Sequence, residues 1–294
     1  MSYHQGNTWQ DQQREGIESV LSGAEIQYYY LDAKRNHDGA QARAEEAFNL
    51  FQNFKPDAII TADDHAQLMF VVPYLKDKVK TPVIFMGVNN DATKYGFPAT
   101  NVTGIVEIKH VREGLNFAQL IDHKIKKVAV IYKDNLSNEL NVEQLKKEQA
   151  DYSIKITKFI KLKSMSEAVD MIKTLQKEVD AIFSLNLTGL INEQGEQLET
   201  TTSMAKLSLL SQIPIIGAES FDIESGALCG IIKTGQEQGA TAARMVYDIL
   251  NGKNIRDIPI TSNKNGQRYI NVTTAKRLGI KLDSAAIRGS VLVR

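Results

Sequence analysis

The sequence predicts a two-lobed α/β fold, in which two similar lobes each contain a parallel sheet flanked by helices. Three observations predict it. Short Val- and Ile-rich runs alternate with longer amphipathic stretches, the two halves of the chain repeat the same order of elements, and polar segments follow the apolar runs. A length of 294 residues, 43% of them hydrophobic, is enough for two cores.

The expected strands are apolar runs of the length of a buried strand. In chain order they are residues 58–60, 83–86, 128–132, 181–183, 215–216 and 228–232. Helical patterns lie between them, for example at 40–54, 138–149 and 166–178. This alternation is typical of parallel strands joined by crossover helices.

The two halves match each other at offsets between 123 and 132 residues. The matched pairs are 55–61 with 178–184, 81–85 with 213–217, 25–31 with 154–160, and 2–4 with 131–133. We interpret them as two copies of one βαβ design, the second with a longer helical segment at 193–211. The alternative remains that short Val/Ile strands look alike in any α/β protein.

The second copy has a full strand at 128–132, whereas only residues 1–3 remain of its counterpart in the first copy. We therefore expect several more apolar residues upstream in the natural gene, after an export signal. No apolar run approaches the roughly 18 residues that span a bilayer. The single cysteine, Cys229, lies in an apolar run and is expected to be a buried hydrophobe.

Ligands of open parallel sheets bind beyond the carboxyl ends of the strands, so two facing sheets would place their polar loops around one shared crevice. The candidate ligand-binding residues in these loops are Tyr3, His4, Trp9, Asp63, Asp64, His65, Asn89, Asn90, Asp134, Asn135, Asn186, Glu219 and Lys233. Each has a structural alternative. A residue such as Asp64 can simply cap a helix, Trp9 can pack rather than stack on a ligand, and Lys233 can be a solvated strand end.

The composition and the missing motifs restrict the function. Lys plus Arg and Asp plus Glu are both 35, and this neutral balance argues against nucleic-acid or membrane-surface partners. The chain has no metal-ligand spacing, no phosphate-binding glycine fingerprint and no nucleophile elbow. No catalytic group, metal or cofactor is therefore predicted. The adjacent Asp63 and Asp64 are the one feature that favours an enzyme.

Several segments together resemble a known family. They are residues 2–6 with Trp9, then 56–60, 81–85, 101–105, 128–132, 179–182, 213–215 and 270–280. In their order and spacing the chain resembles the ABC-transporter substrate-binding proteins of the type I periplasmic-binding fold, in the group with tryptophan- and tyrosine-binding members. The resemblance implies three crossings between lobes, near 101–106, 233–236 and 256–261. The N-terminal lobe would hold 1–104 and 236–258, and the C-terminal lobe 105–235 and 259–294.

Two lobes with polar cleft loops and no catalytic constellation predict capture of a small polar molecule by hinge closure. Because hinge motion needs free lobes, we expect a monomer, periplasmic or extracellular and with or without a lipid anchor. It would deliver this ligand, an amino acid or related metabolite, to an ABC permease. Many relatives carry small residues where 62–65 stand, so we expect a more acidic pocket than a plain aromatic amino acid requires. The alternatives are an extracellular sensor domain of a signalling receptor and an α/β enzyme.

Overall fold

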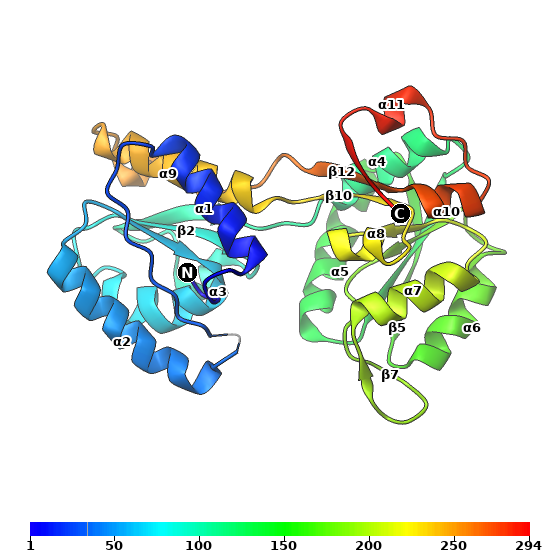
Figure 1. Ribbon diagram of the computed structural model, residues 1–294, viewed down its shortest axis with the longest axis horizontal. Coiled ribbons are helices and arrows are strands. Elements are labelled where there is room, and N and C mark those ends of the chain that lie inside the picture. Colours follow the sequence, from blue (N-terminus) through cyan, green and yellow to red (C-terminus); the bar gives the residue numbers. More distant parts are fainter. Residues whose placement is uncertain (34) are drawn as a thin grey trace. The chain divides into compact units, whose positions relative to one another are not determined.

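The computed structural model describes residues 1–33 and 35–294 and divides the chain into two compact units. Unit 1 contains Met1–Ile108 and Lys233–Asn265, and unit 2 contains Lys109–Ile232 and Gly266–Arg294 (Figure 1). Each unit is a mostly parallel sheet with helices on both faces, which confirms the predicted fold class. Within the described residues no helix has the length and apolar character needed to cross a membrane.

The sheet of unit 1 has the order β1-β2-β3-β11, and all of its strands are parallel. The strands are β1 (Ile59–Ala62), β2 (Val83–Val88), β3 (Val102–Val106) and β11 (Thr261–Ser262). The core on one face includes α2 (His37–Phe54) and η1 (Gln67–Leu75), and the core on the other includes α1 (Thr8–Val20) and α9 (Gly235–Leu250). Shorter elements are α3 (Asp63–Ala66), η2 (Ala92–Tyr95) and η4 (Ile255–Asp257).

The first residues of the chain run beside segment 31–33 in unit 1. The amides of Leu31 and Ala33 donate to the carbonyls of Met1 and Ser2 at 2.9 Å. The Ser2 hydroxyl donates to the Ala62 carbonyl at the end of β1, which connects this segment to the sheet. Segment 25–31, which the sequence matches with 154–160, forms no regular strand here, whereas its counterpart forms one in unit 2 at 155–162.

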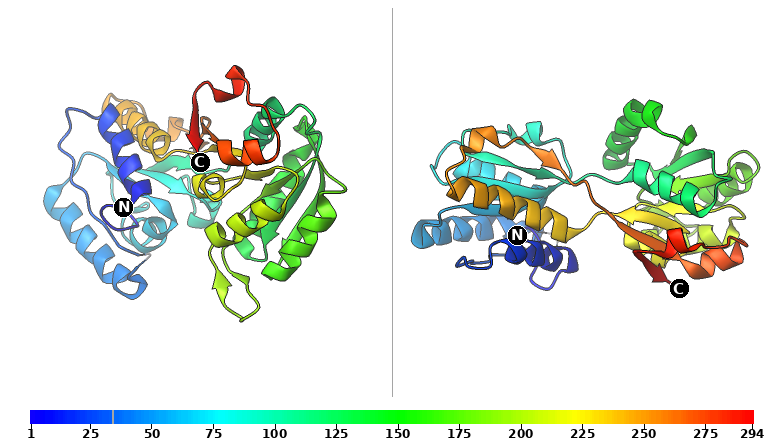
Figure 2. Two further views of the ribbon diagram at one scale, coloured as in Figure 1. Left: turned by 45° about the vertical axis from the view of Figure 1, so that its right-hand side comes forward. Right: turned by 90° about the horizontal axis from the view of Figure 1, so that it is seen from above.

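Helices α1 and α9 lie side by side and approach each other closely (Figures 1 and 2). Glycines make this possible. A methyl group on Gly239 would lie 1.9 Å from the Gln13 carbonyl oxygen, and one on Gly16 would lie 2.2 Å from the Gln236 carbonyl oxygen. Both values are far inside van der Waals contact, so the helix backbones meet at a distance that only glycine permits.

The sheet of unit 2 has seven strands in the order β13-β12-β10-β9-β6-β4-β5. Their bounds are β4 (Lys127–Lys133), β5 (Lys155–Leu162), β6 (Ala181–Ser184), β9 (Ile215–Gly217), β10 (Cys229–Ile232), β12 (Gln267–Asn271) and β13 (Ser290–Val293). Side chains alternate along β4, because Val128 and Val130 join one core while Ala129 and Ile131 join the other. Cys229 is fully buried, as predicted.

Helices cover both faces of this sheet. The first core includes side chains from α4 (Val111–Ile121), α5 (Leu136–Glu148), α10 (Val272–Arg277) and α11 (Ser284–Ile287), and the second includes α6 (Met165–Leu175) and α7 (Thr200–Leu210). The remaining elements are α8 (Ser220–Glu224), η3 (Gln149–Asp151) and the hairpin β7 (Leu190–Ile191) and β8 (Gln197–Leu198). The segment expected to be helical at 193–211 therefore begins as the hairpin, and its helix begins only at Thr200.

The order β1-β2-β3 in unit 1 equals the order β6-β9-β10 in unit 2, which agrees with two copies of one design. The last crossing differs from the expectation. Thr261 pairs with Ile105 in β11, so the chain stays in unit 1 beyond residue 258 and enters unit 2 only at Gly266. Strand β12 then pairs antiparallel with β10, a pairing that the hydrophobic pattern of the sequence does not predict.

Candidate functional site

At the carboxyl edge of the unit 1 sheet, β1 passes directly into α3. The prediction of a polar loop at 62–65 is therefore wrong, because residues 63–66 turn into a helix at once. Asp63 accommodates this turn with a φ of 64°, a left-handed conformation in which Asp and Asn are the most tolerated residues after glycine. Trp9, also expected in a loop, lies in the first turn of α1, because Asn7 caps that helix through the Gln10 amide.

Asp63 is a buried carboxyl group with only 3% of its surface exposed. Its Oδ2 accepts a hydrogen bond from Gln10 Nε2 at 2.7 Å, and the Trp9 side chain also bonds to it. Burial raises the pKa of Asp63 well above its ordinary value, and the nearby Glu107 carboxylate raises it further. Through these hydrogen bonds Asp63 connects α1 with the carboxyl end of β1.

Lys233 forms an ion pair with Glu107, with 3.4 Å between Nζ and Oε1. The two side chains are only 8% and 7% exposed, and Nζ lies 5.9 Å from the centre of the Trp9 ring. Lys233 is therefore not a solvated strand end. Tyr3 belongs to the same group, since burial and the charges of Asp63 and Glu107 raise the pKa of its hydroxyl.

These residues form what we call the edge cluster of unit 1: Tyr3, Trp9, Asp63, Glu107 and Lys233. Four of the five are predicted site residues that the fold brings together. Glu107 was missed, although it follows β3 directly at its carboxyl end, and that position was the available signal. A buried cluster with more acidic than basic groups provides strong, fixed dipoles at this edge.

Asp64 forms hydrogen bonds with the loop that follows β2. Its carboxylate accepts hydrogen bonds from the backbone N–H groups of Asn89 and Asn90 at 3.1 and 3.3 Å. It also accepts one from the Tyr95 hydroxyl at 2.5 Å. Asp64, Asn89 and Asn90 thus lie together at the ends of β1 and β2, and Asp64 does not cap its own helix. His65 lies in α3, partly exposed.

His4 and Asp134 each lie near another charged side chain of their own unit. His4 Nδ1 stands 4.0 Å from Asp32 Oδ1. Asp134 pairs with Lys161 of β5 at 3.4 Å.

Unit 2 has a hollow at the carboxyl ends of β4 and β6. Its volume is about 360 Å³, and it is lined by Asn135, Asn138, Asn186 and Thr188. Asn138 is buried and connects the two strand ends, because its amide nitrogen donates to the carbonyls of Lys133 and Asn186 at 2.9 Å each. Asn135 and Asn186 were predicted from the sequence, whereas Asn138 and Thr188 were not, since one lies inside a predicted helix and the other in a turn.

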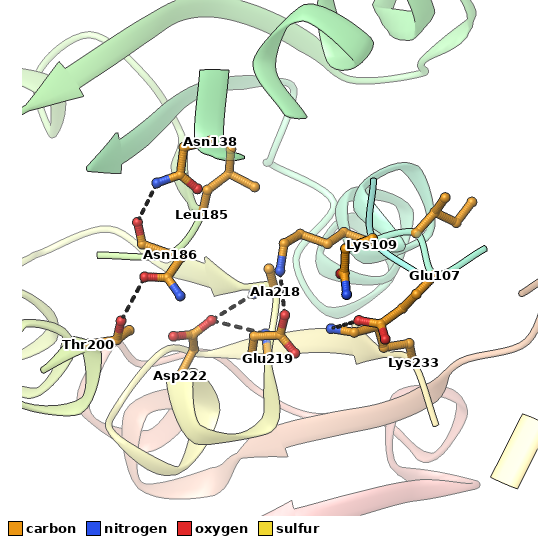
Figure 3. A network of polar contacts seen from close by, with 12 residues as sticks. Glu107, Lys109, Asn138, Leu185, Asn186, Thr200, Ala218, Glu219, Asp222 and Lys233 are labelled. Carbon is orange, nitrogen blue, oxygen red and sulfur yellow. Dashed lines mark hydrogen bonds and ion pairs between the residues drawn. The ribbon is translucent and has the colours of Figure 1, made fainter. Parts of the chain in front are cut away.

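Glu219, at the carboxyl end of β9, pairs with Lys109 in the same unit (Figure 3). Behind it, one carboxylate oxygen of Asp222 accepts the amides of Ala218 and Glu219 at 3.0 Å each. Asp222 is 1% exposed, and burial, followed by the Glu219 charge, raises its pKa to about 7. Neither Lys109 nor Asp222 was predicted. The Glu-x-x-Asp spacing of a capped helix was the only signal for Asp222.

The buried Asp222 carboxyl predicts a specific dependence of stability on pH. It ionises near pH 4 when unfolded and near 7 when folded, so its contribution to stability is complete below pH 4 and is lost as the pH rises through 7. Asp222→Asn keeps an oxygen for both amides but has no proton to release. The stability of wild type relative to the variant should fall by roughly 2.5 kcal/mol between pH 5 and 8.

Urea unfolding of both proteins at four pH values measures this difference in the free energy of unfolding. The contributions of the other titrating groups cancel, because both proteins contain them. The charged neighbours Glu219 and Lys109 are present in both proteins. Parallel pH curves for the two proteins would show that Asp222 titrates as an ordinary exposed carboxyl group.

Among the described residues, no group of three His, Cys, Asp or Glu side chains is placed to hold a metal ion. A sequence profile described as ABC transporter substrate binding protein matches residues 8–290 of the chain. A tyrosine-binding protein from Clostridioides difficile (strain R20291) is 27% identical over 194 residues, which is 64% of this chain and 52% of that protein. The chain thus spans about half the length of this curated relative.

Two solved structures share the fold. The ligand-free, open structure of a substrate binding protein with adhesive properties from Clostridium difficile has a TM-score of 0.77 at 21% identity, covering 100% of this chain and 97% of that one. An ABC domain in complex with L-Trp from Streptococcus pneumonia has a TM-score of 0.61 at 17% identity, with the same coverage. At these identities the likeness extends to the fold alone.

Proposed function

The chain belongs to the family of ABC transporter substrate binding proteins, and we propose that it captures a small polar molecule, an amino acid or a related metabolite, for an ABC permease. Its family and fold are those of binding proteins rather than enzymes. Proteins of this family work outside the cytoplasmic membrane, and we propose a periplasmic or extracellular location for this chain as a monomer.

One observation supports this proposal most. Both units gather polar side chains at the carboxyl edges of their sheets, the edge cluster in unit 1 and the amide-lined hollow in unit 2. In parallel sheets this edge is the usual place for a ligand. The relatives that bind tyrosine and L-Trp favour an amino acid, while the acidic edge cluster favours one with a more polar side chain.

The proposed mechanism is closure around the ligand. A ligand that contacts both units makes its full set of contacts only in the closed form, so binding shifts the population toward that form. A ligand that contacts one unit alone has no preference for either form and shifts nothing. The closed form would then be the one that the permease distinguishes.

The test is a panel of the twenty L-amino acids and common pentoses and hexoses, screened by thermal shift and quantified by calorimetry. One compound class should raise the melting temperature progressively, because its stabilisation grows with the logarithm of its concentration over its Kd. Small-angle scattering with a saturating amount of that compound should show compaction. A panel without any stabilising compound, or unchanged dimensions at saturation, contradicts capture by closure.

Trp9→Ala should weaken binding of the compound found in this panel about tenfold to a hundredfold, because the ring covers Lys233 and bonds to Asp63 at the unit 1 edge. Tyr247→Ala is the matched control. Its ring is 56% exposed near the end of α9, so its loss should leave the affinity unchanged. Equal affinities of Trp9→Ala and wild type would remove the edge cluster from the binding site.

A further inference from the structure

The hollow in unit 2 has two asparagine side chains whose orientation is fixed by the protein itself. The side-chain oxygen of Asn135 accepts a hydrogen bond from the backbone N–H of Asn138 at 2.8 Å. The side-chain oxygen of Asn186 accepts one from the backbone N–H of Thr188 at 2.7 Å. A backbone N–H can only donate, so in both residues the oxygen must face the protein. Each side chain therefore keeps its NH₂ group as the free end, and in the described chain neither NH₂ group has a partner.

A hydroxyl relay confirms the orientation of Asn186. Thr200 donates its hydroxyl hydrogen to the Asn186 oxygen at 3.3 Å. Because a hydroxyl has only one hydrogen to donate, Thr200 cannot also donate to Thr188. In the 2.7 Å contact between the two threonine hydroxyls, Thr188 is therefore the donor. In Figure 3 the amide nitrogen of Asn186 points away from Thr200, as this chain of donors requires.

The charge beside the hollow is positive. Lys133 ends β4 and its Cε lies close to Gly189, next to Thr188. Its ammonium donates to the Asp134 carbonyl at 3.1 Å, and within the described residues it forms no ion pair. The acidic side chains nearby are already engaged, since Asp134 and Glu139 both pair with Lys161.

Resting on the proposed function, we infer that this hollow binds the carboxylate group of the captured molecule through the NH₂ groups of Asn135 and Asn186. Two fixed donors and an adjacent cation match a planar anion with two acceptor oxygens. Asn138 uses both of its amide hydrogens on backbone carbonyls, so its oxygen is left as an acceptor that suits a ligand N–H. The captured class is thus amino acids, with the carboxylate on unit 2.

The test substitutes aspartate for asparagine. Asn186→Asp keeps the oxygen that Thr188 and Thr200 require but replaces the NH₂ donor with a second, charged oxygen. Asn135→Asp does the same and leaves α5 capped, because aspartate caps as well as asparagine. Each variant should bind the amino acid found in the panel at least about 100-fold more weakly, since a donor is lost and a like charge is added. Their melting temperatures should stay near that of wild type.

Asn254→Asp is the control, because Asn254 is an exposed helix cap in unit 1 and receives the same change in charge. A second arm compares each L-amino acid with its carboxamide, which has the same shape without the negative charge. The inference predicts that the acid binds and the carboxamide does not. It is overturned, while the proposed function stands, if the carboxamide binds equally well, if only sugars bind, or if the two aspartate variants bind like wild type. If no compound binds wild type, the proposed function itself fails and the subsite with it.

Discussion

Gly239→Ala is expected to destabilise unit 1 by more than about 3 kcal/mol, because among the glycines its added methyl group would make the shortest contact. The new Cβ would lie 1.9 Å from the Gln13 carbonyl oxygen and 2.9 Å from the carbonyl carbon. Both atoms belong to the backbone of α1, so no side chain can turn aside to make room. The two helices would have to separate, which exposes Ile17, Ala243 and their neighbours in the core.

Urea unfolding measures this loss, and Gly114→Ala is the matched control. Gly114 is also a buried helical glycine, in α4, but its added methyl would meet nothing closer than 3.6 Å. That substitution should be neutral or stabilising by up to about 1 kcal/mol, because alanine favours the helix over glycine. Equal stability of the two variants would show that the contact between α1 and α9 is loose.

Lys233→Met is expected to cost about 3–5 kcal/mol of stability, the penalty typical of removing one partner of a buried ion pair. Methionine retains most of the apolar stem, so packing over Trp9 survives. The variant loses the ammonium group that lies 3.4 Å from the Glu107 carboxylate. The Glu107 side chain, which is 7% exposed, is then left beside a second carboxyl group, that of Asp63. The remaining negative charge would be poorly solvated and close to a second acid.

The double variant Glu107→Gln with Lys233→Met separates charge from packing. Without the carboxylate there is no buried charge to compensate, so the double variant should recover at least half of the lost stability. Thermal and urea unfolding of both proteins give the comparison. A double variant less stable than Lys233→Met would mean that Glu107 stabilises unit 1 through contacts other than the ion pair.

Periodicity predicted β1, β2, β4, β6, β9 and β10, because strands such as β4 and β6 are buried on both faces and form apolar runs. It did not predict β3, β5 or β13 as strands, and in the edge strand β5 lysines interrupt the apolar residues. It failed where elements are short or pair late. Strand β11 has two residues, and the five residues of β12 include Gln267, Arg268 and Asn271, so neither forms an apolar run that distinguishes it from a loop. The turn of residues 63–66 into a helix depends on a left-handed Asp63, which composition cannot indicate.

The candidate site was predictable as a set of strand ends but not as a set of contacts. Asp63 and Lys233 were identified because they follow apolar runs, and Trp9 because it is the only tryptophan and stands among polar residues. Glu107, the partner of Lys233, was not identified, nor were Lys109 and Asp222 beside Glu219, since all three look like ordinary charged residues of a helix or loop. Only the fold reveals that Glu107 and Lys233, far apart in the chain, share one buried position.

The divided sequence of unit 1 has a consequence for biosynthesis. Its first 108 residues leave the ribosome before any of unit 2, but α9 and β11 emerge only after residue 232. Until then Ile84, Met86 and Ile105 lack the helix that covers them. A nascent chain that pauses in unit 2 therefore exposes an uncovered apolar sheet face, the kind of surface that chaperones bind. Translation speed through residues 109–232 should thus influence the yield of folded protein more than speed elsewhere.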